Sequence, residues 1–248
     1  MTRRKTRNTG GHGRFSFEIT RPSRYNALMV LSSKKQREVL KGFYKALFSS
    51  FGPQGWWPGR TKFEVVVGAI LTQNTNWKNV EKAIKNLRAR RLLNPQGMHD
   101  LSVHELAALI RPAGYFNVKA KRLKHFLNHL FDNYSGNLDG FFKRRTDVLR
   151  EELLNINGIG PETADSILLY AANRPIFVID AYTKRILLRH CMIKKHTDYH
   201  EMQRLFMENL VHDSPMFNEY HALIVKTGKD FCKTKEPLCS RCPLGRFL

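Results

Sequence analysis

Apolar side chains recur every three to four residues along most of the chain, which is the spacing of amphipathic helices. The first such stretch begins at Ser33, and its apolar face consists of Val39, Leu40, Phe43, Leu47 and Phe48. Further helical patterns cover Phe63–Leu71, Val80–Leu87, Val103–Ile110, Asn117–Leu130, Val148–Asn155, Met202–Leu210 and Asn218–Val225. We find no convincing strand pairs and no repeat of about 20–50 residues. The sequence therefore predicts an all-α fold.

One short apolar run does not follow the helical spacing. Ile176–Ile179 has the length of a strand, but it runs directly into Asp180 and the helical stretch Ala181–Leu188. Aspartate is a favoured residue at the N-cap of a helix. We therefore interpret the run as an extended lead into a helix that Asp180 caps.

A glycine turn precedes this acid and joins two short helical patterns. Gly158 and Gly160 flank Ile159, and Pro161 suits the first turn of the helix that follows. Glycines tolerate left-handed backbone and allow another molecule to approach closely. The unpaired N–H groups at a helix start attract phosphate. The segment predicts a phosphate clamp with an acid nearby, although an ordinary helix-packing corner has the same pattern.

Charge narrows the class of partner. The 248 residues contain 42 Lys and Arg against 21 Asp and Glu, a net charge of +21. Such an excess indicates a polyanionic partner, with DNA or RNA as the commonest and an anionic membrane surface as the rival. No apolar run reaches the length of about 18 residues that spans a bilayer, and the N-terminus lacks the apolar core of a secretory signal. We expect a cytoplasmic or nucleoid protein.

The N-terminal residues are basic and rich in glycine. Residues 1–24 hold seven Lys and Arg against the single acid Glu18, and three glycines interrupt any pattern. We predict a flexible basic arm over residues 1–30, which either adds salt-sensitive DNA affinity or is a solvated tail without a role.

Three of the four cysteines lie close together near the C-terminus. Cys232, Cys239 and Cys242 fall within eleven residues, whereas Cys191 lies on a different segment. In a reducing compartment such clustering indicates metal binding before disulfide formation.

The glycine turn with Asp180, the cysteine-rich tail and the stretch Leu71–Thr75 (LTQNT) together resemble the helix–hairpin–helix DNA glycosylases related to endonuclease III. The likeness runs from about Phe51 to the C-terminus. It implies two helical lobes with DNA bound in the cleft between them. Residues 54–174 would form a six-helix lobe that contains the hairpin. Residues 31–53 and 175–248 would form the second lobe, which ends in the cysteine-rich loop.

Asp180 matches the position of the essential aspartate of this family. Breaking a base–sugar bond places positive charge on the sugar, and a fixed carboxylate stabilises that charge or orients water. In members that also cut the strand, a lysine follows the second hairpin glycine by two positions and forms a Schiff base. Here that residue is Glu162, so the resemblance implies a monofunctional glycosylase that uses water. Lys184 could in principle substitute, but nothing in the sequence selects it.

Several stretches are similar to the bacterial 3-methyladenine glycosylases of this superfamily, among them Trp56-Trp57-Pro58 and Arg111–Tyr115. The likeness implies an aromatic base pocket at Trp56, Trp57 and Trp77. Electron-poor methylated purines stack well on indoles, although core packing is the alternative role for any tryptophan.

The resemblance also implies residues that contact the DNA strand. An amide of Gln73 or Asn74 would enter the space vacated by the flipped base, unless it only caps a turn. The hairpin contacts would come from Gly158, Ile159, Gly160 and Thr163.

The spacing Cys232-x6-Cys239-x2-Cys242 matches the first three ligands of the family's 4Fe–4S loop. Leu248 stands where the fourth cysteine belongs, so the motif is incomplete. Three explanations of the incomplete motif are possible: the cluster has a non-cysteine fourth ligand, the chain end is altered, or the site has decayed. A fourth is that the site binds zinc, with His221 or His212 as the remaining ligand.

Taken together, these features predict a monomeric DNA N-glycosylase of base-excision repair that acts on alkylated purines in damaged double-stranded DNA. The alternatives are an endonuclease III-like glycosylase and lyase for oxidised pyrimidines, a non-catalytic DNA-binding protein, and RNA binding through charge alone.

Overall fold

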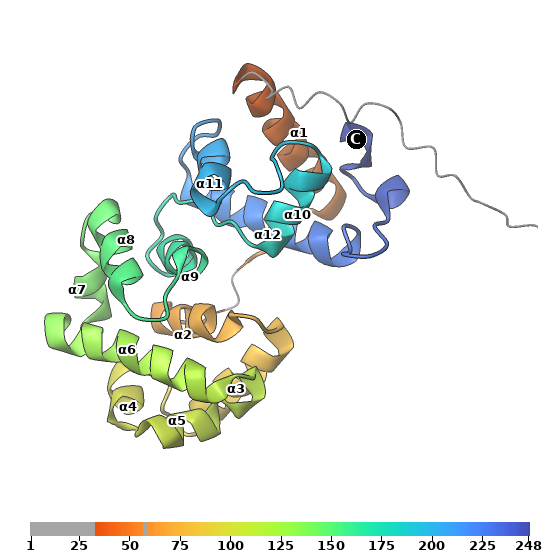
Figure 1. The fold of residues 1–248 in the computed structure, drawn as a ribbon. Coiled ribbons are helices and arrows are strands. Elements are labelled where there is room, and N and C mark those ends of the chain that lie inside the picture. The colour runs from red at the N-terminus through yellow and green to blue at the C-terminus, as the bar shows by residue number, and fades with distance from the viewer. Residues whose placement is uncertain (1–32, 57–58) are drawn as a thin grey trace, which may run out of the picture. The chain divides into compact units, whose positions relative to one another are not determined.

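The computed structural model describes residues 33–56 and 59–248 (Figure 1). The predicted basic arm and Trp57 lie outside these residues. Within them the chain contains helices and no strand, so the predicted all-α fold is confirmed. The longer helices are α1 (Ser33–Phe51), α2 (Lys62–Thr72), α3 (Trp77–Ala89), α6 (Phe116–Tyr134), α8 (Thr146–Asn155), α10 (Ala181–Arg189), α11 (Tyr199–Met207) and α12 (Ser214–Asp230).

Short helices fill the connections. They are α4 (Pro95–Asp100), α5 (Val103–Leu109), α7 (Leu138–Phe142) and α9 (Pro161–Ser166), together with a π-helical turn, η2 (Ile167–Ala171), and three 3₁₀ turns at Arg111–Ala113, Cys239–Arg241 and Gly245–Phe247. Side-chain caps fix most of the starting points, as at Asn94 of α4 and Asn137 of α7. Ile176–Ile179 is extended and unpaired, and it leads into α10 as predicted.

One hydrophobic core lies among α2–α9 and η2. Its largest side chains are Phe63, Phe126, Phe141 and Phe142, and α2 contributes seven apolar side chains to it. A helix that is apolar all round belongs in the centre of a bundle. The helix α2 therefore forms the centre of this core, with α3 and α6 packed against it.

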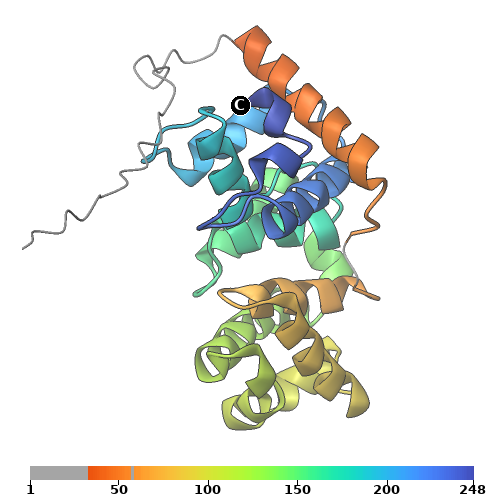
Figure 2. The same ribbon diagram turned by 90° about the vertical axis from the view of Figure 1, so that its right-hand side faces the viewer.

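A second core joins α1 from the N-terminal side to α10, α11 and α12 from the C-terminal side (Figures 1 and 2). The hydroxyl of Tyr220 donates a hydrogen bond to the carbonyl of Leu40, 180 residues away, over 2.8 Å. The ring of Phe177 stacks on Phe206 with centroids 3.8 Å apart. These contacts hold the extended run before Asp180 in place. The lobe boundaries near residues 54 and 175 stay a prediction.

A buried polar network connects the glycine turn to α11. Asp165 of α9 is fully buried and accepts two hydrogen bonds from Arg150 of α8, at 2.7 and 3.1 Å. It also accepts hydrogen bonds from Tyr199 at 2.8 Å and Gln203 at 2.7 Å. The Tyr199 hydroxyl in turn accepts the N–H of Ile179 over 3.4 Å. One carboxylate thus links the hairpin to the segment that positions Asp180.

Candidate functional site

The glycine turn between α8 and α9 has two glycines with different structural roles. Gly158 has φ +91°, and a side chain there would clash with Arg122. Gly160 has φ −93°, and a Cβ there would meet nothing within 4 Å. The expectation that both glycines provide left-handed backbone is therefore correct only for Gly158. The fold does not need glycine at position 160, but the open space beside it admits another molecule.

The other predicted hairpin residues support the turn from inside. Ile159 is buried, and its N–H donates to the carbonyl of Ile156 over 3.0 Å. Thr163 is also buried, and its hydroxyl accepts a hydrogen bond from the Gln73 amide at 2.9 Å. An open hollow of about 620 Å³ runs along the hairpin, with Arg122 on its wall. The predicted contact residues of the hairpin therefore present their backbone to solvent more than their side chains.

Gln73 is held against this hairpin. Its amide nitrogen donates to the carbonyl of Gly158 at 3.0 Å as well as to Thr163, and its amide oxygen accepts from Arg122. Asn74 follows with φ +53° and lines the neighbouring pocket. The structure thus places both amides beside the hairpin, and their entry into a vacated base position stays a prediction.

Asp180 lies at the N-terminus of α10 with its two carboxylate oxygens in different environments. Oδ1 accepts hydrogen bonds from the Thr183 N–H at 2.7 Å and from the Thr183 hydroxyl at 2.8 Å. Oδ2 lies 3.6 Å from Nε2 of His221. Burial alone would raise the pKa of Asp180, but His221 and the Thr183 hydrogen bonds outweigh burial and bring the pKa below its ordinary value. The carboxylate is therefore ionised at neutral pH.

A tyrosine on η2 orients the histidine. The Tyr170 hydroxyl is hydrogen-bonded to Nδ1 of His221. Burial, followed by the charge of Asp180, raises the pKa of Tyr170 well above its ordinary value, so this hydroxyl keeps its proton. Nε2 on the other side of the ring lies toward Oδ2 of Asp180. Tyr170, His221 and Asp180 thus form one connected row of polar side chains, with the histidine ring between the hydroxyl and the acid.

Asp180 opens into a pocket of about 580 Å³, within the size range of small-ligand sites. Trp56 and Trp77 both line it. The Lys229 ammonium lies 5.5 Å from the centre of the Trp56 ring, and Trp77 donates its indole N–H to Glu81 over 2.9 Å. Two of the three predicted pocket tryptophans are therefore beside the candidate acid.

Glu162 also lines this pocket, a role that the sequence did not indicate. Its side chain is exposed to solvent in the first turn of α9. Partial desolvation by the surrounding protein, followed by the nearby charge of Asp180, raises the pKa of Glu162 to about 7. The site therefore combines an ionised carboxylate with a carboxyl that holds its proton more readily. Lys184, the substitute amine considered above, is exposed on α10 and does not line the pocket.

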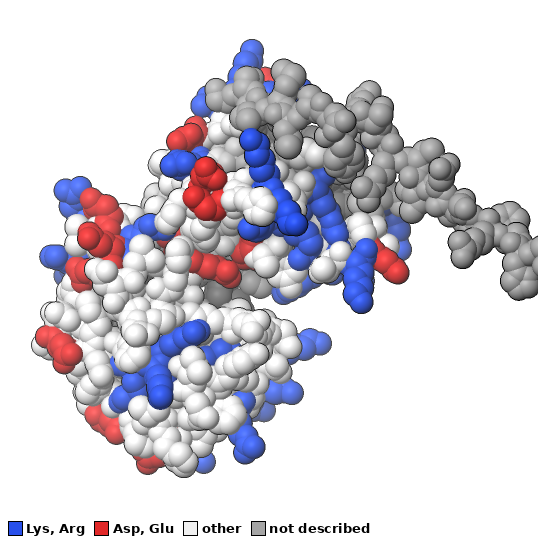
Figure 3. Space-filling view, in the orientation of Figure 1, with Lys and Arg blue, Asp and Glu red and all other residues white. Residues whose placement is uncertain are grey.

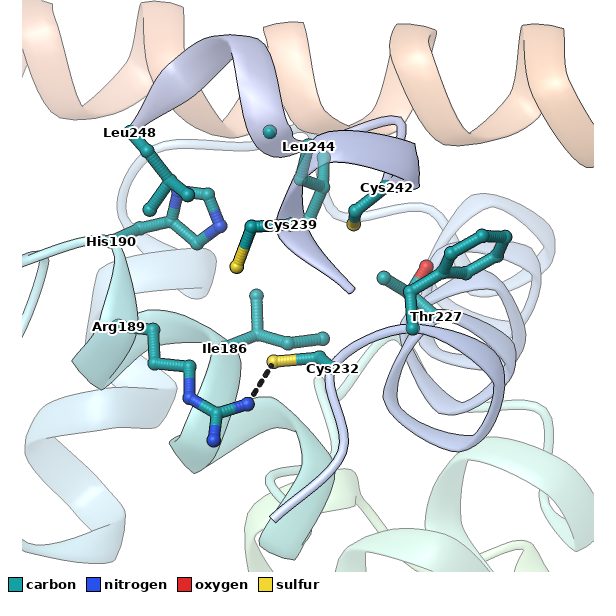
Figure 4. Close-up of a pocket in the computed structure, with 11 residues that line it drawn as sticks. Ile186, Arg189, His190, Thr227, Cys232, Cys239, Cys242, Leu244 and Leu248 are labelled. Carbon is teal, nitrogen blue, oxygen red and sulfur yellow. Dashed lines mark hydrogen bonds between the residues drawn. The ribbon is translucent and has the colours of Figure 1, made fainter. Parts of the chain in front are cut away.

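The three clustered cysteines lie away from this pocket. Cys232, Cys239 and Cys242 surround a small cavity below the C-terminus, together with Leu248 and His190 (Figure 4). The two histidines considered for zinc are elsewhere, because His221 contacts Asp180 and His212 is bonded to the carbonyl of Met207. Among residues 33–56 and 59–248, no group of three His, Cys, Asp or Glu side chains is close enough to bind one metal ion.

Basic side chains are spread over the face shown in Figure 3. Lys and Arg gather over α6 and over the helices of the second core, while acidic side chains lie over α8 and α11, among other places. In the described part of the chain, no helix is long and apolar enough to span a membrane.

Three comparisons relate the chain to known proteins. Residues 67–211 match the family described as HhH-GPD superfamily base excision DNA repair protein. A protein of Methanocaldococcus jannaschii that is named as a candidate DNA repair glycosylase is 50% identical over 212 residues, which cover 85% of this chain and 96% of that protein. Endonuclease III of Thermotoga maritima is 29% identical over 180 residues, which cover 73% of this chain and 79% of the relative.

A solved structure supports the same relationship. The 3-methyladenine DNA glycosylase of H. pylori, bound to 1,N6-ethenoadenine, matches with a TM-score of 0.68 and 29% identity, over 78% of this chain and 97% of the other. The helix–hairpin–helix resemblance drawn from the sequence is thereby confirmed.

Proposed function

Because this chain belongs to the HhH-GPD superfamily of base excision DNA repair proteins, we propose that it is a monofunctional DNA glycosylase that releases alkylated purines by hydrolysis. The observation that carries the proposal is the ionised carboxylate of Asp180 beside an aromatic-walled pocket, with Glu162 at the hairpin position that a lyase would fill with lysine. Its substrate would be double-stranded DNA with the damaged base turned out of the stack.

In this proposal Asp180 stabilises charge on the sugar. Thr183 binds Oδ1 through two hydrogen bonds, so the carboxylate cannot rotate freely. Oδ2 remains directed toward His221 and the pocket. As the base leaves, positive charge develops on the sugar ring, and a fixed negative group stabilises that state without reorganising. The same oxygen can orient the attacking water.

Trp56 and Trp77 supply apolar walls for the everted base. The H. pylori structure contains 1,N6-ethenoadenine, an alkylated purine, which supports this substrate class. Lys229 lies over the Trp56 ring, where it would repel a cationic base. We therefore expect an uncharged alkylated purine to bind in this pocket more tightly than a cationic one.

Glu162 would assist departure of the base rather than attack the sugar. A carboxyl with a pKa of about 7 is protonated often enough at neutral pH to donate a hydrogen bond to a purine ring nitrogen. A carboxylate cannot form an imine, so no covalent DNA adduct follows from this residue. The amines that line the pocket are Lys78 and Lys229.

A panel of duplexes tests this function. Each duplex contains ethenoadenine, a cationic N-methylpurine or an oxidised pyrimidine, and base release is measured with and without borohydride. We expect release of the alkylated purines, weaker binding of the duplex that contains the cationic one and no trapped adduct. No adduct is expected because water, and not an amine, attacks the sugar.

The other outcomes identify the alternatives. Release of oxidised pyrimidines with a trapped adduct would show a glycosylase and lyase, and loss of trapping in Lys229→Gln or Lys78→Gln would then identify the amine. Binding to every duplex without base release would indicate a non-catalytic DNA-binding protein. Equal binding of plain RNA in competition would refute selection for damaged DNA.

The two hairpin glycines offer a matched test of DNA contact. Gly160→Ala should fold normally, because its backbone suits any residue and its Cβ meets open space. If a phosphate packs there, this variant should bind duplex roughly tenfold more weakly, a loss of about 1.4 kcal/mol. Gly158→Ala should lose stability, because φ is positive and Arg122 lies in the way. Binding by fluorescence anisotropy and thermal unfolding separate the two effects, and unchanged affinity in Gly160→Ala would remove the clamp from the proposal.

A further inference from the structure

Four potential ligand side chains meet at one enclosed place under the C-terminus. Cys232 follows α12, Cys239 and Cys242 lie on the 3₁₀ turn and just after it, and His190 ends α10. We call the space between them the cysteine hollow, and its volume is about 20 Å³. Figure 4 shows the sulfurs of Cys232 and Cys239 and the ring of His190 directed toward it. A water molecule needs about 10–15 Å³, so the centre is not filled by protein.

His190 has an unsatisfied nitrogen at this place. Its Nδ1 is buried and has no hydrogen-bond partner among the residues that the structure describes. A buried polar atom without a partner costs about 1–3 kcal/mol and calls for an explanation. The ring is also held by a backbone hydrogen bond to Phe247 and by an edge contact to Phe43 at 4.8 Å. Histidines that bind metals are commonly oriented in this way, with one ring nitrogen bonded to the backbone.

The neighbouring residues leave His190 as the available fourth donor. Leu248 lines the hollow where the sequence spacing would place a cysteine, and its side chain has no donor atom. Cys191 is exposed and does not line the hollow. Arg189 also reaches it, but a guanidinium has no lone pair to give and instead donates a hydrogen bond to Sγ of Cys232 at 3.1 Å.

We propose that His190 is the fourth ligand of a 4Fe–4S cluster whose other ligands are the three cysteines of the hollow. A tetrahedral zinc ion needs all of its ligands around one centre, and no such close group occurs among the described side chains. A cluster binds each ligand to a different iron atom, so its ligands stand farther apart. The Arg189 guanidinium would offset part of the negative charge of the Cys232 thiolate, to which it donates a hydrogen bond. The cluster is structural, because it ties the C-terminal loop to α10.

The test measures metal content and ligand identity in the full chain, purified without oxygen from iron-replete cells. We expect about four irons and four sulfides per chain and an absorbance shoulder near about 400 nm. His190→Ala should lose one iron, leaving about three per chain and the paramagnetic signal of an oxidised 3Fe–4S cluster. His190→Cys should keep four irons with a lower reduction potential, because histidine ligation raises the potential relative to cysteine.

A control variant and a direct measurement on the unmodified chain separate loss of a ligand from loss of folding. His212→Ala should match the unmodified chain, because His212 is exposed and bonded to Met207. In the unmodified chain labelled with ¹⁵N-histidine, pulsed electron paramagnetic resonance of the reduced cluster should show coupling to a histidine nitrogen. Absence of that coupling, four irons retained in His190→Ala, or zinc or no metal in the unmodified chain would each overturn the proposal.

Discussion

Replacing Asp180 with asparagine is expected to lower the rate of base release by a factor of roughly 10²–10³, the usual effect of removing one group that stabilises transition-state charge. The carboxylate is ionised and points into the pocket, whereas an amide carries no charge to balance the sugar cation. Single-turnover release of an alkylated purine from duplex DNA measures the effect.

The same variant contains its own control for folding. Asparagine is as good an N-cap as aspartate, so Asp180→Asn can keep the hydrogen bond from the Thr183 N–H and should unfold at nearly the same temperature. Asp180→Ala loses both the negative charge and the N-cap hydrogen bond, and it should be less stable by about 1 kcal/mol. DNA affinity should persist in Asp180→Asn, because the hairpin is untouched. Base release at the unmodified rate in this variant would refute the catalytic role.

Replacing Asp165 with asparagine should destabilise the fold by about 3 kcal/mol, the lower end of the range for breaking a buried ion pair. The lower end applies because Arg150 is 21% exposed and can regain some water. For a chain of this size the loss corresponds to a fall in melting temperature of about 6–12 °C. An amide nitrogen cannot accept hydrogen bonds from Arg150, Tyr199 or Gln203, so part of the network is lost. Chemical denaturation measures the change.

Asp147 provides the matched exposed acid. It pairs with Arg145 at 2.9 Å, and both side chains are more than half exposed. Asp147→Asn should therefore change stability by less than about 1 kcal/mol. Similar losses in the two variants would mean that the Asp165 network contributes no more than a surface pair.

The longer helices could be predicted because each repeats apolar residues over two turns or more. The predicted stretch Phe63–Leu71, for example, lies inside α2. The short helices α4 and α7 were missed, because five or six residues show too little periodicity. Their signals were the caps Asn94 and Asn137, which accept N–H bonds from residues three positions on.

The site could be predicted only where its residues are neighbours in sequence. The glycine turn and Asp180 form one continuous segment. Trp56 and Trp77 were predicted from the family resemblance, and both line the same pocket as Asp180. The pair Tyr170 and His221 could not be found in this way, because 51 residues separate them and tertiary packing alone brings them together. For the same reason, the sequence pointed to His221 and His212 as zinc ligands and overlooked His190.

The helix α10 spans only nine residues, yet its first turn is capped by Asp180 and its last residue is followed by His190. A helix of nine residues is only about 14 Å long, so these two residues lie on one short element. We therefore expect a substitution that displaces His190 from its packing to be felt at Asp180, at the opposite end of the same helix.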